Sequence, residues 1–148
     1  MSGQNEIRIL GIDYGSVRIG LAISDPLGII AQPIDAVMQS RNLIADLQSV
    51  IEKEHVTVIV VGLPLNLKGV EAKTAQEVQK FVERLRSEIS LPVEMWDERF
   101  TTAIAQKTMI AMGTKKKERQ KKNGRIDSMA AAVMLQNYLD SRKHSIVC

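Results

Sequence analysis

The sequence is poor in several residue types that commonly cross-link small domains or hold metals. Its 148 residues include one cysteine, Cys148, and two histidines. An intramolecular disulfide is therefore excluded, a zinc site would lack its usual ligands, and a reducing cytoplasm is the expected environment. Aromatic residues make up 3% of the chain, which argues against a surface on which single-stranded bases stack in succession.

Long hydrophobic runs are also missing. The longest apolar stretch covers residues 58–61 and continues through Gly62 and Leu63, far short of the roughly 20 residues that a membrane-spanning helix needs. The first residues, MSGQNEIRIL, do not place an apolar segment after a basic one, as an export signal does. We therefore expect neither export nor a membrane partner.

What the sequence does contain is enough apolar material for a core. Hydrophobic residues make up 45% of the chain, and its length is typical of one domain. No repeat and no linker between domains divides the sequence. We therefore expect a single domain over residues 1–148.

Basic charge is concentrated in one segment. Seven basic residues and Glu118 lie between positions 115 and 125, which gives this segment a net charge of +6. Because the whole chain has a net charge of +3, the remainder carries −3. The basic residues are Lys115, Lys116, Lys117, Arg119, Lys121, Lys122 and Arg125. Such a segment predicts a local contact with a polyanion such as structured nucleic acid, with a solvated loop as the alternative.

The first part of the chain has the pattern of an antiparallel meander. Residues 7–14 and 18–25 are β-rich runs, and Gly15-Ser16-Val17 between them predicts a hairpin turn with positive φ at the glycine. A third run, residues 29–37, contains Pro33. Because proline is tolerated mainly on edge strands, the third strand should lie at a sheet edge.

Helices and strands alternate in the rest of the chain. The expected elements are a helix capped by Asn42, a strand over 56–63, a helix carrying Ala75, Val78, Val82, Leu85 and Ile89, a strand over 93–96, a helix from Thr101 or Thr102 to about Gly113, and a last helix over about 126–142. The predicted fold class is α/β, with a mixed five-stranded sheet of three antiparallel and then parallel strands, flanked by helices. Ligands of such sheets bind at the carboxyl ends of the parallel strands.

Acidic residues follow two of the predicted strands. Asp13 ends the first strand between Gly11 and Gly15, where a metal or phosphate could approach the backbone; an Asx-turn is the alternative role. Asp97 and Glu98 follow the strand over 93–96, and adjacent residues of a strand face opposite ways, so at most one of them can easily share a site with Asp13. We prefer Glu98 over Asp97.

A third acid, Asp127, opens the last predicted helix. Positions 127, 130, 131, 134 and 138 share one helical face, and its other members are alanines, a methionine and a tyrosine. Asp127 is therefore expected to face the sheet, and the alanines would let the helix lie close to it. The alternative is an acidic residue favoured by the helix dipole.

Three carboxylates at one sheet edge repel one another unless cations neutralise them. Oxygen ligands select Mg²⁺ or Mn²⁺, and two such ions about 3.5–4 Å apart activate a water and stabilise the leaving oxygen of a phosphodiester. The acids thus predict a metal-dependent nuclease. Arg18 is a further candidate, either for holding a phosphate or for bracing the hairpin.

Several motifs together resemble those of the YqgF/RuvX family. They are Gly11-Ile12-Asp13-Tyr14-Gly15 with Arg18-Ile19-Gly20, Val61-Gly62-Leu63-Pro64 with Gly69, Asp97 to Thr102, and Ile126 to Ala131 followed by Leu135-Gln136. The resemblance implies an RNase H-like fold related to Holliday-junction resolvases, a cytoplasmic bacterial protein and a nuclease that matures the 5′ end of precursor 16S ribosomal RNA. Asp13, Glu98 (or Asp97) and Asp127 take the acidic positions.

One departure leaves other functions open. The fourth strand ends in Gly62-Leu63-Pro64-Leu65-Asn66, without the carboxylate that related resolvases place there, so a non-catalytic RNA-binding assembly factor is an alternative. A resolvase of branched DNA is another, and it would favour a homodimer over a monomer. An ATP-dependent phosphotransferase, suggested by the hairpin over Gly11 to Gly20, would need a second such domain, for which the chain has no room.

Overall fold

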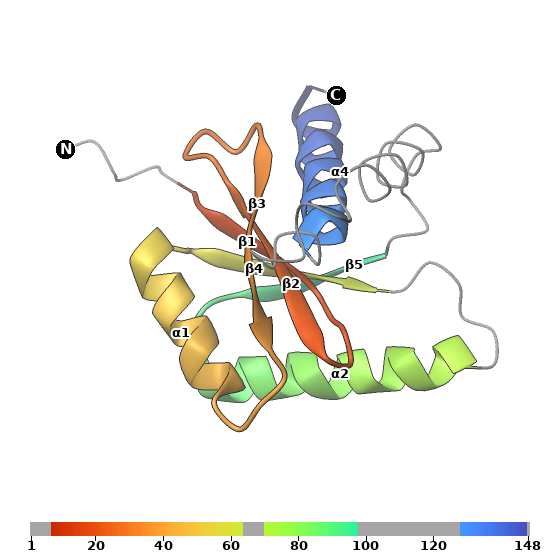
Figure 1. The fold of residues 1–148 in the computed structure, drawn as a ribbon. Coiled ribbons are helices and arrows are strands. Elements are labelled where there is room, and N and C mark those ends of the chain that lie inside the picture. The colour runs from red at the N-terminus through yellow and green to blue at the C-terminus, as the bar shows by residue number, and fades with distance from the viewer. Residues whose placement is uncertain (1–6, 64–69, 98–127, 148) are drawn as a thin grey trace, which may run out of the picture.

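A computed structural model describes residues 7–63, 70–97 and 128–147 of the chain. The elements are β1 (Ile9–Asp13), β2 (Arg18–Ser24), β3 (Ala31–Met38), α1 (Leu43–Glu54), β4 (Val58–Leu63), α2 (Val70–Glu88), β5 (Val93–Asp97) and α4 (Met129–Val147) (Figure 1). The helix predicted to end near Gly113 lies outside the described residues. None of the described helices is long and apolar enough to cross a membrane.

The five strands form one mixed sheet in the order β3-β2-β1-β4-β5. β1 pairs antiparallel with β2, and β2 antiparallel with β3, while β4 and β5 continue the sheet in parallel with β1. This arrangement confirms the predicted architecture. Pro33 lies on the edge strand β3, where a missing backbone N–H is tolerated.

Helices cover both faces of the sheet (Figure 1). On one face α1 and α2 bury a core that includes Leu47, Phe81 and Leu85. On the other face α4 packs over the central strands through residues that include Met134 and Leu135. Both faces of β1 and β4 are therefore buried, which explains why these strands are almost entirely apolar in sequence.

Gly11 brings α4 close to the sheet. A Cβ at this position would lie 2.9 Å from the Cβ of Leu135, so a larger residue would push the helix away. Ala131 belongs to the same cluster, as predicted, but its alanine neighbour there is Ala132 and not the predicted Ala130. We had expected Gly11 to make room for a metal or phosphate. It makes room for α4 instead.

The expectation of positive φ at Gly15 is wrong. Among the described glycines only Gly28 has a positive φ, of 71°. Gly15 is needed for a different reason, because a Cβ there would overlap the carbonyl oxygen of Arg18. The turn between β1 and β2 is therefore tight in space rather than left-handed in backbone conformation.

The prediction that the Asn42 side chain caps α1 is also wrong. Asn42 occupies the N-cap position, but its side chain makes no capping hydrogen bond. Ser40 organises this helix start instead, since its hydroxyl accepts from the Asn42 N–H at 3.1 Å and its carbonyl accepts from the Leu43 N–H at 3.2 Å. A serine two residues upstream thus takes the role we gave to the asparagine.

Most predicted boundaries differ from the observed ones by a few residues, and two of them are notable. β4 begins at Val58 rather than at Val56, because the Val56 N–H donates to the carbonyl of Ile51 at the end of α1. The last α-helix begins at Met129 rather than near residue 126, and Ser128 before it is in a 3₁₀ conformation.

Candidate active site

Asp13 lies at the centre of the sheet, at the carboxyl end of β1. It pairs with Gly20 of β2 on one side and with Gly62 of β4 on the other. Residues directly opposite one another on neighbouring strands share a face, so the side chain of Asp13 has a position without a side chain on each flank. Trp96 of β5 pairs with Gly62 and extends the row. We call Gly20, Asp13, Gly62 and Trp96 the Asp13 row.

The Asp13 row faces the α4 side of the sheet. Ile9 packs in the cluster formed with α4, and Gly11 contacts Leu135 of that helix. Because side chains alternate along a strand, Asp13 shares the face of these two residues. The candidate site thus lies on the face of the sheet that α4 covers, near the start of this helix.

The electrostatic state of Asp13 is unusual. Burial raises the pKa of its carboxyl group from 3.8 to about 6. Within the described part of the chain no hydrogen bond or ion pair offsets this burial, which also removes the support for an Asx-turn. A buried carboxylate without a partner is costly, and a bound cation would remove the cost.

Ser128 attaches the start of α4 beside the Asp13 row. Its hydroxyl is fully buried and accepts the Leu21 N–H at 3.0 Å. Leu21 lies at a register shift between β2 and β3, where an irregular ladder leaves a backbone donor for the serine. Leu21 also adjoins Gly20, the partner of Asp13 on β2. Sequence reasoning missed this contact, because it joins residues 107 positions apart.

Gln136 attaches α4 to the sheet a second time. Its side-chain oxygen accepts the Ala31 N–H at 3.0 Å, and its side-chain nitrogen donates to the carbonyl of Ile29 at 2.8 Å. Together with Ser128, this side chain holds the helix on β2 and on the start of β3. The Leu135-Gln136 pair of the sequence motif therefore has a structural role at the helix–sheet contact.

Trp96 belongs to the packed core next to the site. Its ring meets Tyr138 of α4 edge-on, with 5.5 Å between the ring centroids. The Tyr138 hydroxyl donates to Glu94 at 2.8 Å, and burial followed by this carboxylate raises the pKa of the tyrosine. A ring held in this way is a wall of the site rather than a surface on which a base stacks.

The structure brings only part of the predicted site together. Asp97 ends β5 opposite Leu63, one residue beyond the Asp13 row. Glu98, Asp127 and the basic residues between positions 115 and 125 lie outside the described residues. Within residues 7–63, 70–97 and 128–147, no three His, Cys, Asp or Glu side chains form a group that could hold a metal.

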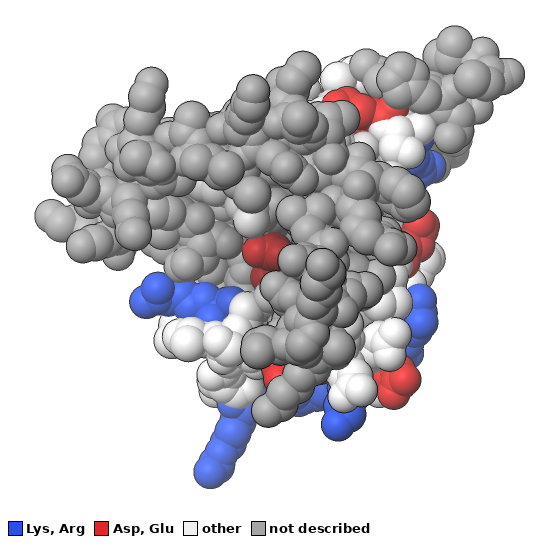
Figure 2. All heavy atoms as spheres, turned by 90° about the vertical axis from the view of Figure 1, so that its right-hand side faces the viewer, with Lys and Arg blue, Asp and Glu red and all other residues white. Residues whose placement is uncertain are grey.

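Arg18 starts β2 at the same edge of the sheet. It is exposed and pairs with Met38 of β3. Figure 2 looks onto this side of the molecule: acidic atoms of described residues are visible near its centre, and basic side chains lie below them. Acidic and basic side chains of the described residues are thus both exposed on this face.

Comparison with known protein families gives one match over most of the chain. The model of the family described as RuvX, Holliday junction resolvase, matches residues 7–141. A protein of Sulfurihydrogenibium sp. is 42% identical over 135 residues, covering 90% of each chain, and one of Geobacillus kaustophilus is 40% identical over 141 residues, covering 93% of this chain and all of that protein. Both relatives are described as candidate pre-16S rRNA nucleases.

Solved structures share the fold at low sequence identity. RuvC of T. thermophilus, in complex with a Holliday junction substrate, superposes with a TM-score of 0.56 at 16% identity, covering 93% of this chain and 96% of that one. The Fowlpox virus resolvase with its junction DNA gives 0.51 at 15% identity, covering 92% and 99%. The fold is therefore the RNase H-like fold of these resolvases, as the sequence motifs implied.

Proposed function

Because the chain belongs to the RuvX family of Holliday junction resolvases, we propose that it is a metal-dependent nuclease that hydrolyses phosphodiester bonds. The observation that carries the proposal is the partly buried Asp13 carboxylate, whose pKa is raised to about 6 and which has a glycine on each flank. The proposed substrate is precursor 16S ribosomal RNA, in keeping with the description of the relatives as pre-16S rRNA nucleases. We further propose that cleavage takes place in the 5′ region of this RNA and in the cytoplasm.

Asp13 fits a divalent metal better than it fits a structural role. Its carboxylate is partly buried without a described partner, and it offers hard oxygen ligands of the kind that Mg²⁺ and Mn²⁺ prefer. We propose that Glu98 and Asp127 complete the ligand set. The described residues next to them in sequence are Asp97, at the end of β5, and Ser128, attached beside the Asp13 row.

The register of β5 favours Glu98 over Asp97 as the middle ligand. Trp96 shares the row of Asp13, and side chains alternate between the two faces of a strand. A continued alternation gives position 98 the face of Trp96 and Asp13. The longer side chain of a glutamate also suits the separation of β1 and β5, which have β4 between them.

The proposed reaction is the attack of a water on the phosphorus atom, with cleavage of one P–O bond and protonation of the leaving oxygen. Metal ions bound at the acids would lower the pKa of the attacking water and neutralise charge on the leaving oxygen. Asp13 would hold its charge above about pH 6. Arg18 and the basic segment over residues 115–125 would bind neighbouring phosphates and thereby position the strand.

The test compares the wild type, Asp13→Asn and a matched control, Asp46→Asn, which removes an exposed carboxylate from the first turn of α1. Each is incubated with a precursor 16S fragment in Mg²⁺, Mn²⁺ or EDTA. We expect the cleavage rate of Asp13→Asn to fall at least about 100-fold, because removing one electrostatic element of an active site has an effect of this size. Asp46→Asn should cleave at the wild-type rate. Cleavage that survives both EDTA and Asp13→Asn contradicts the metal mechanism.

A second substrate follows from the same family. The family description names a Holliday junction resolvase, and T. thermophilus RuvC is seen with such a junction. The same three proteins are therefore assayed on a four-way DNA junction. If the protein cleaves the junction but not the RNA fragment, the substrate is branched DNA rather than RNA. If it binds but cleaves neither substrate, a non-catalytic assembly factor is favoured.

A further inference from the structure

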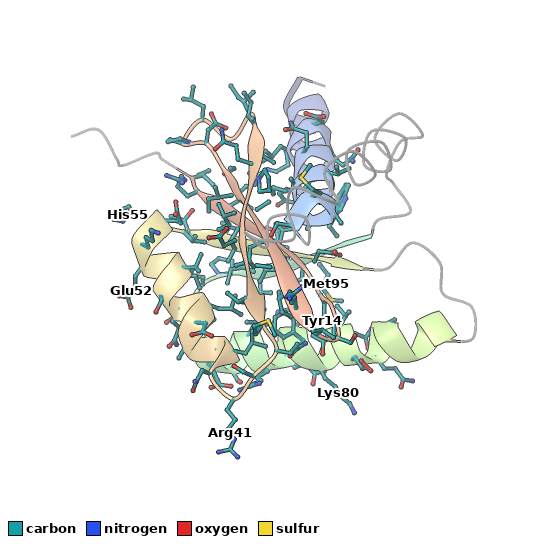
Figure 3. The ribbon with its side chains drawn as sticks, viewed as in Figure 1. Tyr14, Arg41, Glu52, His55, Lys80 and Met95 are labelled. Carbon is teal, nitrogen blue, oxygen red and sulfur yellow. The ribbon has the colours of Figure 1, made fainter. Side chains whose placement is uncertain are left out.

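A groove lies on the face of the sheet opposite to the Asp13 row. It has a volume of about 230 Å³, opens to solvent and runs beside α2. Its inner end is apolar: Leu43 and Phe81 are almost fully buried, and the Tyr14 ring packs on Phe81 with 5.1 Å between centroids. Figure 3 shows Tyr14 over α2 and Lys80 projecting from the same helix.

The rim of the groove is basic. Lys80 and Arg84 both line it and are one helical turn apart on α2. Arg84 also contacts Glu88 at 3.0 Å, but both side chains are nearly half exposed, and such pairs contribute little. Two cations thus lie over an apolar floor, and Glu77 is the acidic residue among those that line the groove.

The groove is connected to the candidate active site through consecutive residues. Tyr14 directly follows Asp13, and neighbouring residues at the end of a strand face opposite sides of the sheet. Gln39 lines the groove and fixes the turn after Tyr14, because its side-chain nitrogen donates to the Gly15 carbonyl at 2.9 Å and its N–H to the Val17 carbonyl at 2.9 Å. A chain that passes around this edge of the sheet would leave Asp13 and reach the groove.

We propose that the groove binds one phosphate–sugar unit of the nucleic acid as the strand leaves the active site. This inference rests on the proposed nuclease function. Pockets for whole small molecules measure about 300–1,000 Å³, so an open groove of about 230 Å³ suits a segment of a longer chain. Lys80 and Arg84 bind the phosphate, Tyr14 and the apolar floor pack against the sugar, and the side-chain oxygens of Gln39 and Glu77 accept hydrogen bonds where the sugar carries a hydroxyl.

The test measures the affinity of Lys80→Ala, Arg84→Ala and the double variant for a precursor 16S fragment and for DNA of the same sequence. Lys53→Ala, which removes an exposed lysine from α1, is the matched control. Binding is measured in EDTA at several salt concentrations. We expect the double variant to bind RNA and DNA about 10-fold more weakly and its salt slope to fall by about one to two, whereas Lys53→Ala changes affinity less than about 2-fold.

Thermal unfolding of each variant verifies that the fold is intact. A double variant that binds like Lys53→Ala would overturn the inference, as would a loss confined to either RNA or DNA, because the phosphate is common to both. Cleavage by the wild type in Mg²⁺ is scored separately. If the double variant binds more weakly but the wild type does not cleave, the nuclease proposal is wrong and the groove proposal stands. If the wild type cleaves but the double variant binds normally, the groove proposal is wrong and the nuclease proposal stands.

Discussion

The two ends of β1 differ in how their polar groups are satisfied. Beside its amino end, Arg8 forms an ion pair with Glu54 at 3.2 Å, and its N–H donates to the Thr57 hydroxyl at 3.1 Å. The Ile9 N–H donates to the buried Ser24 hydroxyl at 2.9 Å. At the carboxyl end, the Asp13 carboxylate is partly buried without an offsetting partner among the described residues.

The two ends of β1 thus serve different purposes: the amino end stabilises the fold, and the carboxyl end serves function. Paired groups at the amino end connect the start of β1 to β2, to α1 and to Thr57 before β4. The exception among the described residues is the Nε of Arg8, which is buried without a hydrogen-bond partner. The carboxyl end keeps a costly charge beside two glycines, which is typical of a site that a ligand completes. The largest test of this contrast should therefore come from Asp13.

Asp13→Asn should stabilise the metal-free protein at neutral pH. The pKa of Asp13 rises from 3.8 to about 6 on folding, so the unfolded chain ionises first, and the free energy of unfolding falls as pH rises from about 4 to 6. Above pH 6 the full cost is present, at up to about 3 kcal/mol. Denaturant unfolding in EDTA should show Asp13→Asn more stable than wild type by up to about 3 kcal/mol at pH 7.5 and by less than about 1 at pH 4.

A divalent metal should reverse this ranking. Saturating Mg²⁺ or Mn²⁺ binds the folded wild type and raises its stability, whereas Asp13→Asn should gain little. An Asp13→Asn protein that is less stable than wild type in EDTA at pH 7.5 would show that the carboxylate is structurally satisfied. The two ends of β1 would then no longer differ.

Two buried serines provide a matched comparison of the ends. Ser24 accepts the Ile9 N–H and Ser128 the Leu21 N–H, and both are fully buried. Replacing either by alanine leaves a buried donor unpaired and should lower the free energy of unfolding by about 1–3 kcal/mol, measured by denaturant titration. Only Ser128→Ala should also slow cleavage per folded molecule, because Ser128 is attached beside the Asp13 row. Equal rates in the two variants would argue against that role.

The smallest effect is expected from the ion pair at the amino end. Arg8 and Glu54 have side chains 23% and 26% exposed, so water screens much of their attraction. Glu54→Gln should cost less than about 1 kcal/mol in thermal unfolding and leave cleavage unchanged. A rate change in this variant would mean that the amino end of β1 also serves the reaction.

Local sequence correctly indicated where two of the strands lie in the sheet. Pro33 correctly indicated an edge strand, and the apolar run ending at Leu63 indicated a buried parallel strand. Asn42 and Gly15 misled, because a cap depends on which nearby polar group reaches the free N–H, and a glycine serves either backbone conformation or space. Ser40 and the Arg18 carbonyl decide those two positions.

The sequence by itself determined the order of elements, the sheet of three antiparallel and two parallel strands, and Asp13 as a candidate ligand at a strand end. Only the tertiary structure decided that Gly20 and Gly62 flank Asp13 and that Ser128 reaches Leu21. Periodicity reports which face of its own element a residue takes. Which residue lies opposite it depends on register and on long-range hydrogen bonds, and these form only when distant segments pack together.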